Sequence, residues 1–233
     1  EWTEQKKYIN AYSFVDALSD ELSNNDVVVV DGGGTVVYTA FQSFKVREGQ
    51  RLIISSGICA MGSGLPESVG ASFAKKRGRT ICLCGDGSMQ LNIQELQTIF
   101  HHKLPVKIFI FNNDGYLAIR HTQDGFLNSS YVGSDSGGGV SLPDYLKVAG
   151  AYGIPSERVY SYGELSRSIR RTLETDGPAV CEIMIPRDQE VSPRQGFSKQ
   201  ADGTFRPTPL EDMYPFLDRK EFAENMVVAP WEK

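Results

Sequence analysis

Two polar side chains, Asp86 and Asn113, follow two apolar segments of the sequence and have the residue types of a metal site. Asp86 lies in a Gly-Asp-Gly-Ser sequence directly after the apolar run 81–84, and Asn113 follows the run 106–111. Apolar runs of this length, without polar alternation, are typical of parallel strands covered on both faces. Because ligands of open α/β sheets bind at the carboxyl ends of the strands, we expect Asp86 and Asn113 to lie together there.

The chemistry expected of these residues is that of a divalent cation that carries a phosphate. Asp86 offers a carboxylate oxygen, Asn113 an amide oxygen and Gly115 a backbone carbonyl, a small set of hard ligands that suits Mg²⁺. Gly85 and Gly87 would let the backbone approach a phosphate closely, and the helix expected after them could present free N–H groups to an anion. A Gly-Asp-Gly sequence alone indicates only a tight turn. Its pairing with two asparagines at the end of the next strand is far more specific.

A second glycine-rich segment, the glycine loop 32–35, could hold the other side of the same phosphate group. It follows a strand expected at 27–30 and precedes a helix expected at 36–44. The loop does not match GxGxxG, which disfavours dinucleotide binding. Taken alone it could be an ordinary loop, but its expected place at the same sheet edge as Asp86 favours phosphate binding.

The order of the expected elements indicates a doubly wound α/β domain, with a mainly parallel sheet of about six strands flanked by helices. We expect this domain over residues 1–187, followed over 188–233 by an extended tail with a short helix near 218–226. The aromatic tail could pack on its own domain or on a partner subunit. The other expected elements are helical spacing within 1–25, a strand at 52–54, a loop at 57–64, a helix from Pro66 to the basic residues 75–77, helices at 142–152 and 163–174, and a strand at 179–185.

The composition disfavours several classes of function. A net charge of −5 offers no basic face of the kind that nucleic acid requires. No apolar run approaches the roughly 18 residues of a membrane span, and no signal peptide is visible. Cys82 and Cys84 stand two apart on an expected strand, where both would be small buried residues, and no second ligand pair accompanies them. We therefore expect a cytoplasmic protein.

The paired signals, GDGS after one strand and two asparagines after the next, resemble the thiamin-diphosphate motif of the 2-oxo-acid decarboxylase and acetolactate synthase families. The resemblance runs from about Asp26 to about Arg187 and implies the pyrophosphate-binding domain of such an enzyme, with thiamin diphosphate and Mg²⁺ as cofactors. The metal ligands that it implies are Asp86, Asn113 and Gly115. The cofactor-binding residues that it implies are Gly33, Gly34, Thr35, Cys59, Met61, Gly85, Asp86, Gly87, Ser88, Asn113, Gly115, Tyr116 and Leu117.

The segment SSGICAMGSGLPESVGA, residues 55–71, is similar to the acetolactate synthase segment that surrounds the aminopyrimidine ring of the cofactor. By that resemblance Met61 would lie beneath the cofactor and impose its bent shape. The Cys59 carbonyl and the Met61 amide would form hydrogen bonds with the ring.

The resemblance also implies that this chain needs a second domain for activity. In the family a pyrimidine-binding domain supplies the glutamate that activates the cofactor, and we find no candidate for that domain here. Glu95, on the helix expected after GDGS, is better interpreted as structural. We therefore expect no catalytic residue in this chain, little turnover from it alone, and a homo-oligomer. The chain would be the carboxyl-terminal part of a longer protein, which the absence of an initiating Met favours, or one subunit of a split decarboxylase.

The substrate is left open. The resemblance implies decarboxylation of a 2-oxo acid, followed by protonation or by addition to a second carbonyl. Acetolactate synthases usually carry a tryptophan nine residues beyond the second asparagine, where this sequence has Thr122. A different acceptor, such as a keto-sugar, is therefore open, as is the presence of a flavin. His121 could contact the substrate or be solvated, and the Gly- and Ser-rich segment 125–140 could be a lid or a disordered loop.

Three other classes are alternatives. A non-catalytic module that retains the fold is disfavoured by the intact residues Asp86, Asn113 and Gly115. The small subunit of a 2-oxo-acid:ferredoxin oxidoreductase normally carries iron–sulfur clusters, and the four scattered cysteines of this chain do not supply the necessary cysteine clusters. A nucleotide-binding α/β protein is disfavoured because the sequence has neither a P-loop nor a dinucleotide fingerprint.

Overall fold

The chain divides into two compact units, residues 1–189 and 190–233. The computed structural model describes residues 7–54, 57–200 and 202–228, so Ser55 and Ser56 of the predicted cofactor segment and the first six residues of the predicted N-terminal helix lie outside the described part. Unit one is an α/β domain with a six-stranded sheet in the order β2-β1-β3-β4-β6-β5. Every neighbouring pair of strands is parallel, which confirms the predicted fold class.

The four inner strands of the sheet are almost completely buried, which explains their mainly apolar sequences; the charged exceptions are Lys107 in β4 and Glu182 in β6. The edge strand β5 has the sequence Ser-Glu-Arg-Val and was not predicted, because an edge position tolerates polar residues. The strands are β1 (Val27–Val30), β2 (Arg51–Ile54), β3 (Thr80–Gly85), β4 (Val106–Asn112), β5 (Ser156–Val159) and β6 (Ala179–Met184).

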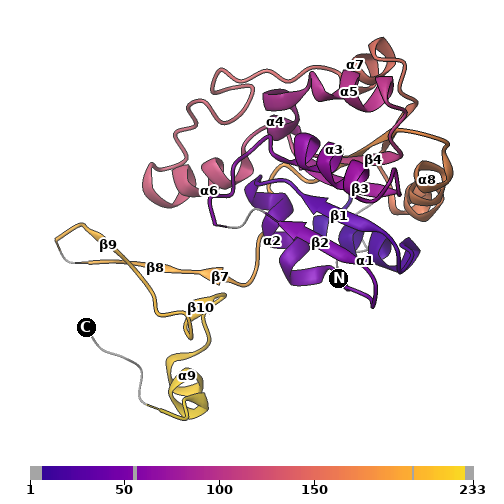
Figure 1. Ribbon diagram of the computed structural model, residues 1–233. Coiled ribbons are helices and arrows are strands. Elements are labelled where there is room, and N and C mark those ends of the chain that lie inside the picture. The colour runs from indigo at the N-terminus through magenta and orange to yellow at the C-terminus, as the bar shows by residue number, and fades with distance from the viewer. Residues whose placement is uncertain (1–6, 55–56, 201, 229–233) are drawn as a thin grey trace. The chain divides into compact units, whose positions relative to one another are not determined.

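Helices cover both faces of the sheet (Figure 1). One face carries α1 (Ala11–Glu21), α2 (Gly34–Ser43) and α8 (Tyr162–Glu174). The other carries α3 (Gly64–Ala74), α5 (Glu95–His101) and α7 (Tyr145–Ala151). Phe14 of α1 packs on Phe109 and Phe111 of β4, with ring centroids 5.4 and 5.1 Å apart. Cys82 and Cys84 are both buried in the opposite layer, as predicted.

Several elements differ from their predicted form. The helix expected after Gly87 is broken into α4 (Asp86–Met89), a 3₁₀ turn at Gln90–Asn92, and α5. Helix α7 begins three residues later than predicted, because Pro143 precedes an Asp144 cap whose carboxylate accepts a hydrogen bond from the Leu146 N–H. Helix α6 (Leu117–Phe126) was not predicted at all.

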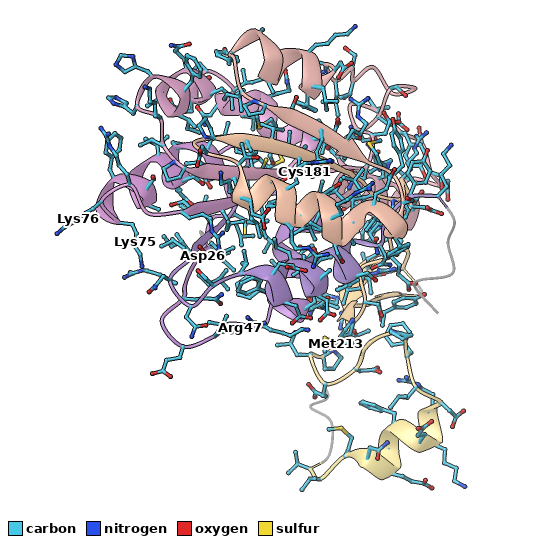
Figure 2. All side chains as sticks on the ribbon, turned by 90° about the vertical axis from the view of Figure 1, so that its right-hand side faces the viewer. Asp26, Arg47, Lys75, Lys76, Cys181 and Met213 are labelled. Carbon is cyan, nitrogen blue, oxygen red and sulfur yellow. The ribbon has the colours of Figure 1, made fainter. Side chains whose placement is uncertain are left out.

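Figure 2 labels two lysines that follow α3 and one cysteine of the sheet. Lys75 and Lys76, which follow α3, extend away from the domain, whereas Cys181 of β6 lies inside it. The predicted basic residues 75–77 thus follow α3, with Lys75 as its C-cap, and the last turn of the helix itself contains no basic residue.

The second unit contains two short antiparallel pairs and one helix. Strand β7 (Arg194–Gln195) pairs with β10 (Met213–Tyr214), and β8 (Phe197–Lys199) pairs with β9 (Phe205–Pro207). Helix α9 (Arg219–Asn225) lies within the predicted range, and the Asp218 carboxylate caps its first turn. The strand pairs were not predicted, because each strand has only two or three residues. In neither unit does the described part of the chain contain a helix long and apolar enough to cross a membrane.

A buried carboxylate connects the edge strand β5 to the end of β4. Glu182 of β6 is fully buried, and its two oxygens accept hydrogen bonds from Arg158 Nε and Asn112 Nδ2, each at 2.5 Å. A buried carboxylate that loses its cationic partner pays a large desolvation penalty. Loss of Arg158 alone, which would leave Glu182 buried without its cation, should therefore cost far more stability than loss of one partner of an exposed ion pair.

We predict that Arg158→Met lowers the free energy of unfolding by about 3 kcal/mol, measured by urea denaturation. The matched control is Arg171→Met, which breaks the exposed pair between Arg171 and Glu157 and should cost no more than about 1 kcal/mol. Equal losses in the two variants would contradict the importance assigned to the buried pair.

Candidate functional site

The carboxyl ends of β1, β3 and β4 meet at one edge of the sheet and border a cavity. Every residue predicted to bind the cofactor lines this cavity except Cys59. That these residues bind a cofactor stays a prediction, but the structure does bring them together. The lining residues are Gly32, Gly33, Gly34, Thr35, Val36, Met61, Gly85, Asp86, Gly87, Ser88, Phe111, Asn113, Gly115, Tyr116, Leu117, Ala118 and Ile119.

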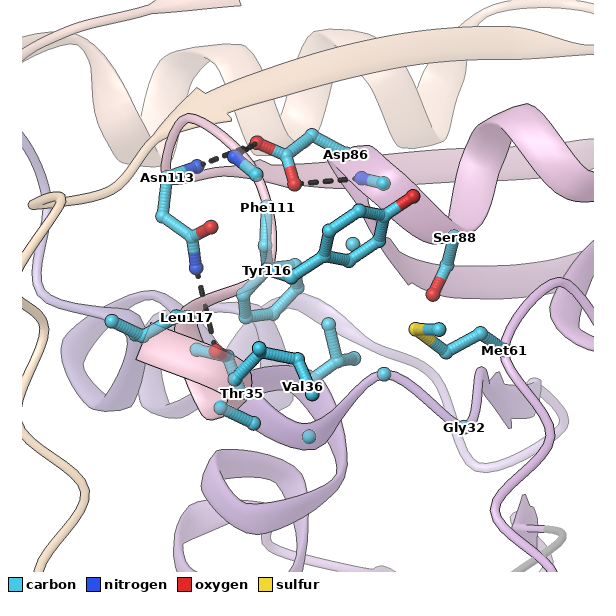
Figure 3. Close-up of a pocket in the computed structure, with 17 residues that line it drawn as sticks. Gly32, Thr35, Val36, Met61, Asp86, Ser88, Phe111, Asn113, Tyr116 and Leu117 are labelled. Atoms are coloured by element: carbon cyan, nitrogen blue, oxygen red, sulfur yellow. Dashed lines mark hydrogen bonds between the residues drawn. The ribbon is translucent and has the colours of Figure 1, made fainter. Parts of the chain in front are cut away.

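Asp86 stands at the end of β3 and is almost completely buried. Its Oδ1 accepts a hydrogen bond from the Gly87 N–H at 2.7 Å, and its Oδ2 accepts from the N–H groups of Asn113 and Gly115, each at 3.0 Å (Figure 3). Burial raises the pKa of Asp86 to about 6, although the three N–H groups act in the opposite direction. The carboxylate is therefore ionised at neutral pH but poorly compensated.

Asn113 follows the neighbouring strand β4, and one polar atom of its side chain has no hydrogen-bond partner among the described residues. Its Nδ2 donates to the Thr35 hydroxyl at 3.3 Å, which connects it to the glycine loop (Figure 3). Its Oδ1 is buried and has no hydrogen-bond partner among the described residues. A buried amide oxygen without a partner costs about 1–3 kcal/mol. A buried polar atom without a partner in the protein alone is expected where a bound ligand or ion completes the site.

The turn 112–115, which we call the metal turn, requires glycine at its last position. Gly115 has φ 114°, and a Cβ there would stand 2.4 Å from the carbonyl oxygen of Ser134. Its N–H is used by Asp86, and the predicted role of its carbonyl as a metal ligand stays a prediction. Gly87 is constrained by contact instead, since a Cβ would stand 2.3 Å from the ring of Tyr116.

The segment 57–64 approaches the cavity through Met61, which is 44% exposed. Cys59 has φ 51° and packs its carbonyl against Gly32 rather than lining the cavity. Met61 therefore lines the cavity and Cys59 does not, and the predicted contacts of both residues with a cofactor stay predictions.

Two residues that support the site were not assigned a role from the sequence. Asp31 ends β1 and is buried, and its carboxylate accepts from the Gly33 N–H at 3.1 Å and from the Gly64 N–H at 2.8 Å. It thereby holds the glycine loop next to the start of α3, and burial raises its pKa. Its position directly after an apolar strand is the same signal that identified Asp86.

The second supporting residue is Tyr145 of α7, whose buried hydroxyl donates to the main-chain oxygen of Asp86. The same hydroxyl accepts a hydrogen bond from Gln90 Nε2 at 3.4 Å. No local pattern could have identified Tyr145, because it lies 59 residues from Asp86 in the sequence.

Other predicted residues lie outside the cavity lining. Glu95 begins α5, and its structural role stays a prediction; like His121 and Thr122, it does not line the cavity. In the segment 125–140, Ser134 and Asp135 are buried, and the Ser134 carbonyl accepts from the Tyr116 N–H at 2.9 Å. This part of the segment is therefore packed against the metal turn, and its movement as a lid stays a prediction.

The donor set of the cavity fits a hard divalent cation. The described residues contain no group of three or more His, Cys, Asp and Glu side chains that could hold a metal ion. One carboxylate and one amide oxygen at the cavity instead match a cation that keeps water and phosphate oxygens as its remaining ligands.

Comparisons with known proteins agree with this geometry. Residues 31–183 match the family described as "Thiamine pyrophosphate enzyme, C-terminal TPP binding domain". The chain is 34% identical over 207 residues to acetolactate synthase 1, chloroplastic, of Nicotiana tabacum, which covers 83% of this chain and 31% of that protein. It is 35% identical over 178 residues to acetolactate synthase 3, chloroplastic, of Brassica napus, which covers 75% of this chain and 27% of that protein.

A third similar protein is the large subunit of an acetolactate synthase. The acetolactate synthase large subunit of Cyanidium caldarium is 37% identical over 154 residues, which covers 66% of this chain and 26% of that protein. The matched region thus spans less than a third of the length of each of these three relatives.

We predict that the metal-free chain loses stability as the pH rises from about 4 to about 7. The pKa of Asp86 is about 6 in the folded chain and about 3.9 in an unfolded one. Between these values the folded state holds a proton that the unfolded state has released, so a higher pH favours unfolding. The loss should be about 3 kcal/mol at most.

The measurement is urea unfolding in EDTA at several pH values, for the wild type and for Asp86→Asn, which cannot titrate. The stability of the wild type relative to the variant should fall across this range. A difference between them that does not depend on pH would contradict the assigned pKa.

Proposed function

Because this chain belongs to the thiamine pyrophosphate enzymes and contains their C-terminal TPP-binding domain, we propose that it binds the diphosphate of thiamin diphosphate through Mg²⁺ at the edge of β1, β3 and β4. The observation that carries the proposal is the Asn113 Oδ1 atom, which is buried without a hydrogen-bond partner among the described residues, in a residue that lines the cavity together with Asp86 and donates its main-chain N–H to the Asp86 carboxylate. A cation would satisfy both oxygens at once.

The proposed metal ligands are the Asp86 carboxylate, the Asn113 side-chain oxygen and the Gly115 carbonyl. The Asn113 amide nitrogen is engaged by Thr35, and this hydrogen bond leaves the amide oxygen as the ligand. Because Mg²⁺ in proteins usually takes few protein oxygens and completes its octahedron with phosphate and water, a site this small is appropriate.

The proposed diphosphate contacts come from the glycine loop 32–35 and the start of α2. Gly33 and Gly34 line the cavity without side chains, and α2 begins at Gly34. The first N–H groups of a helix have no partner inside the helix and favour an anion. The Asp31 carboxylate fixes this loop by accepting from the Gly33 N–H.

The remaining chemistry must come from outside this set of residues. When bound, thiamin diphosphate supplies the electron sink for the decarboxylation of a 2-oxo acid. Among the lining residues, all of which are described in the structure, Asp86 is the only carboxylate, and three backbone N–H groups engage it. We propose that the activating acid comes from another domain or subunit, a pyrimidine-binding domain. Release of carbon dioxide from pyruvate by this chain alone, with thiamin diphosphate and Mg²⁺, would contradict the proposal that the activating acid comes from elsewhere.

We propose a carboligase or decarboxylase that acts on a 2-oxo acid within a homo-oligomer, and the similarity of this chain to acetolactate synthases supports the proposal. One subunit of a decarboxylase split over two chains is the alternative. Thr122 is exposed, and its hydroxyl donates to the Ala118 carbonyl within α6, so it gives no information about the acceptor substrate.

We predict that thiamin diphosphate binds to the chain in Mg²⁺ and binds at least about tenfold more weakly in EDTA, as measured by calorimetric titration. Asp86→Asn should remove most of the Mg²⁺ dependence, since loss even of residues that only support a metal ligand costs about 10–100-fold in affinity.

The matched control is Asp20→Asn, which makes the same change at an exposed aspartate of α1 that does not line the cavity. It should bind as the wild type does. Binding that depends neither on Mg²⁺ nor on Asp86 would overturn the proposed site, and so would an absence of binding to the wild-type chain.

A further inference from the structure

Arg120 of α6 is a buried arginine whose guanidinium group contacts four main-chain carbonyls around the metal turn. Only 3% of the residue is exposed. Its Nη1 donates to the carbonyls of Asp114 at 3.0 Å and Ser134 at 3.2 Å. Its Nη2 donates to the carbonyls of Asn113 and Arg187, both at 2.8 Å.

This arrangement is costly for the protein. Arg120 is the fourth residue of α6, and the side chain reaches back to the turn before the helix, where the helix dipole disfavours a positive charge. Burial of a charge among neutral carbonyls adds a desolvation penalty. The carboxylates of Asp86, Asp114 and Asp135 provide countercharge, whereas Arg187 opposes it. Local costs of this kind are typical of functional positions.

The four contacts join three separate stretches of chain. The carbonyls of Asn113 and Asp114 belong to the metal turn, that of Ser134 to the segment 125–140, and that of Arg187 to the chain after β6. The Ser134 carbonyl also accepts from the Tyr116 N–H at 2.9 Å. A planar guanidinium presents its donors in a fixed fork, so it can fix the relative positions of these stretches, which a lysine cannot do.

The hydrogen bond from Arg120 helps to fix the orientation of Asn113. Its N–H donates to Asp86, its Nδ2 donates to Thr35 and its carbonyl accepts from Arg120. With these three groups held, Oδ1 is the polar atom that remains for a ligand. We propose that Arg120 is a positioning residue that fixes the metal turn, so that Asn113 Oδ1 is pre-oriented for Mg²⁺, and that it holds Ser134 against the turn. This inference rests on the proposed function.

The test uses the full chain with Arg120→Ala and Arg120→Lys, and with Arg171→Ala, an exposed arginine on α8, as the control. Mg²⁺ is titrated calorimetrically at a saturating concentration of thiamin diphosphate. We expect Arg120→Ala to weaken Mg²⁺ about 10–100-fold, as loss of a residue that orients a metal ligand does. Arg120→Lys should fall between the wild type and the alanine variant, and Arg171→Ala should match the wild type.

Two further readouts separate positioning from general stability. Millimolar methylguanidinium should restore Mg²⁺ affinity to Arg120→Ala, because the cavity left by the side chain is lined by the four carbonyls. Hydrogen exchange of the metal-free chain should be faster at the amides of Gly115 and Tyr116 in Arg120→Ala and Arg120→Lys, and unchanged in β1 and β6.

The outcomes are distinct. Mg²⁺ affinity in Arg120→Ala equal to the wild type would overturn the inference and leave the proposed function intact. A weakened affinity without rescue and without local change in exchange would also overturn it. If the wild type itself binds no Mg²⁺ with thiamin diphosphate, the proposed function fails. The exchange of the Gly115 and Tyr116 amides in Arg120→Lys then decides alone whether Arg120 holds the turn.

Discussion

The candidate site depends on one buried carboxylate that its surroundings do not fully satisfy. Asp86 accepts hydrogen bonds from three backbone N–H groups, yet burial still raises its pKa to about 6. Beside it, Asn113 holds an amide oxygen that has no donor among the described residues. The negative charge of the Asp86 carboxylate is not neutralised, and in the described part of the chain Asn113 Oδ1 has no hydrogen-bond donor. A divalent cation removes both deficits, and a phosphate bound to that cation would be held as well.

The rest of the domain keeps the two strand ends beside each other. Strands β3 and β4 pair in parallel from Thr80 to Gly85, which places Asp86 next to the end of β4. Phe14 packs on β4 from one face of the sheet, and the Tyr145 hydroxyl donates a hydrogen bond to the main-chain oxygen of Asp86 from the other face. Both helical layers therefore position the same edge, and Glu182 adds a buried contact to Asn112.

The sequence was sufficient for the parts of the site that follow local rules. An apolar strand that ends at a polar residue identified Asp86, and the same pattern at Asp31 was available but was given no role. Tyr145 and Arg120 could not be predicted, because their partners are distant in sequence or are main-chain atoms of another segment. Strand β5 was missed because an edge strand needs little apolar sequence. The sequence leaves the acceptor substrate open, and Thr122, which lies outside the cavity lining, does not identify it.

The most direct measurement is a crystal structure of the chain with thiamin diphosphate and Mn²⁺, which replaces Mg²⁺ and gives an anomalous signal. The account predicts one anomalous peak between the Asp86 carboxylate and Asn113 Oδ1, with the diphosphate against the glycine loop 32–35. A peak at another place, or an Asn113 side chain turned so that its oxygen meets Thr35, would contradict it.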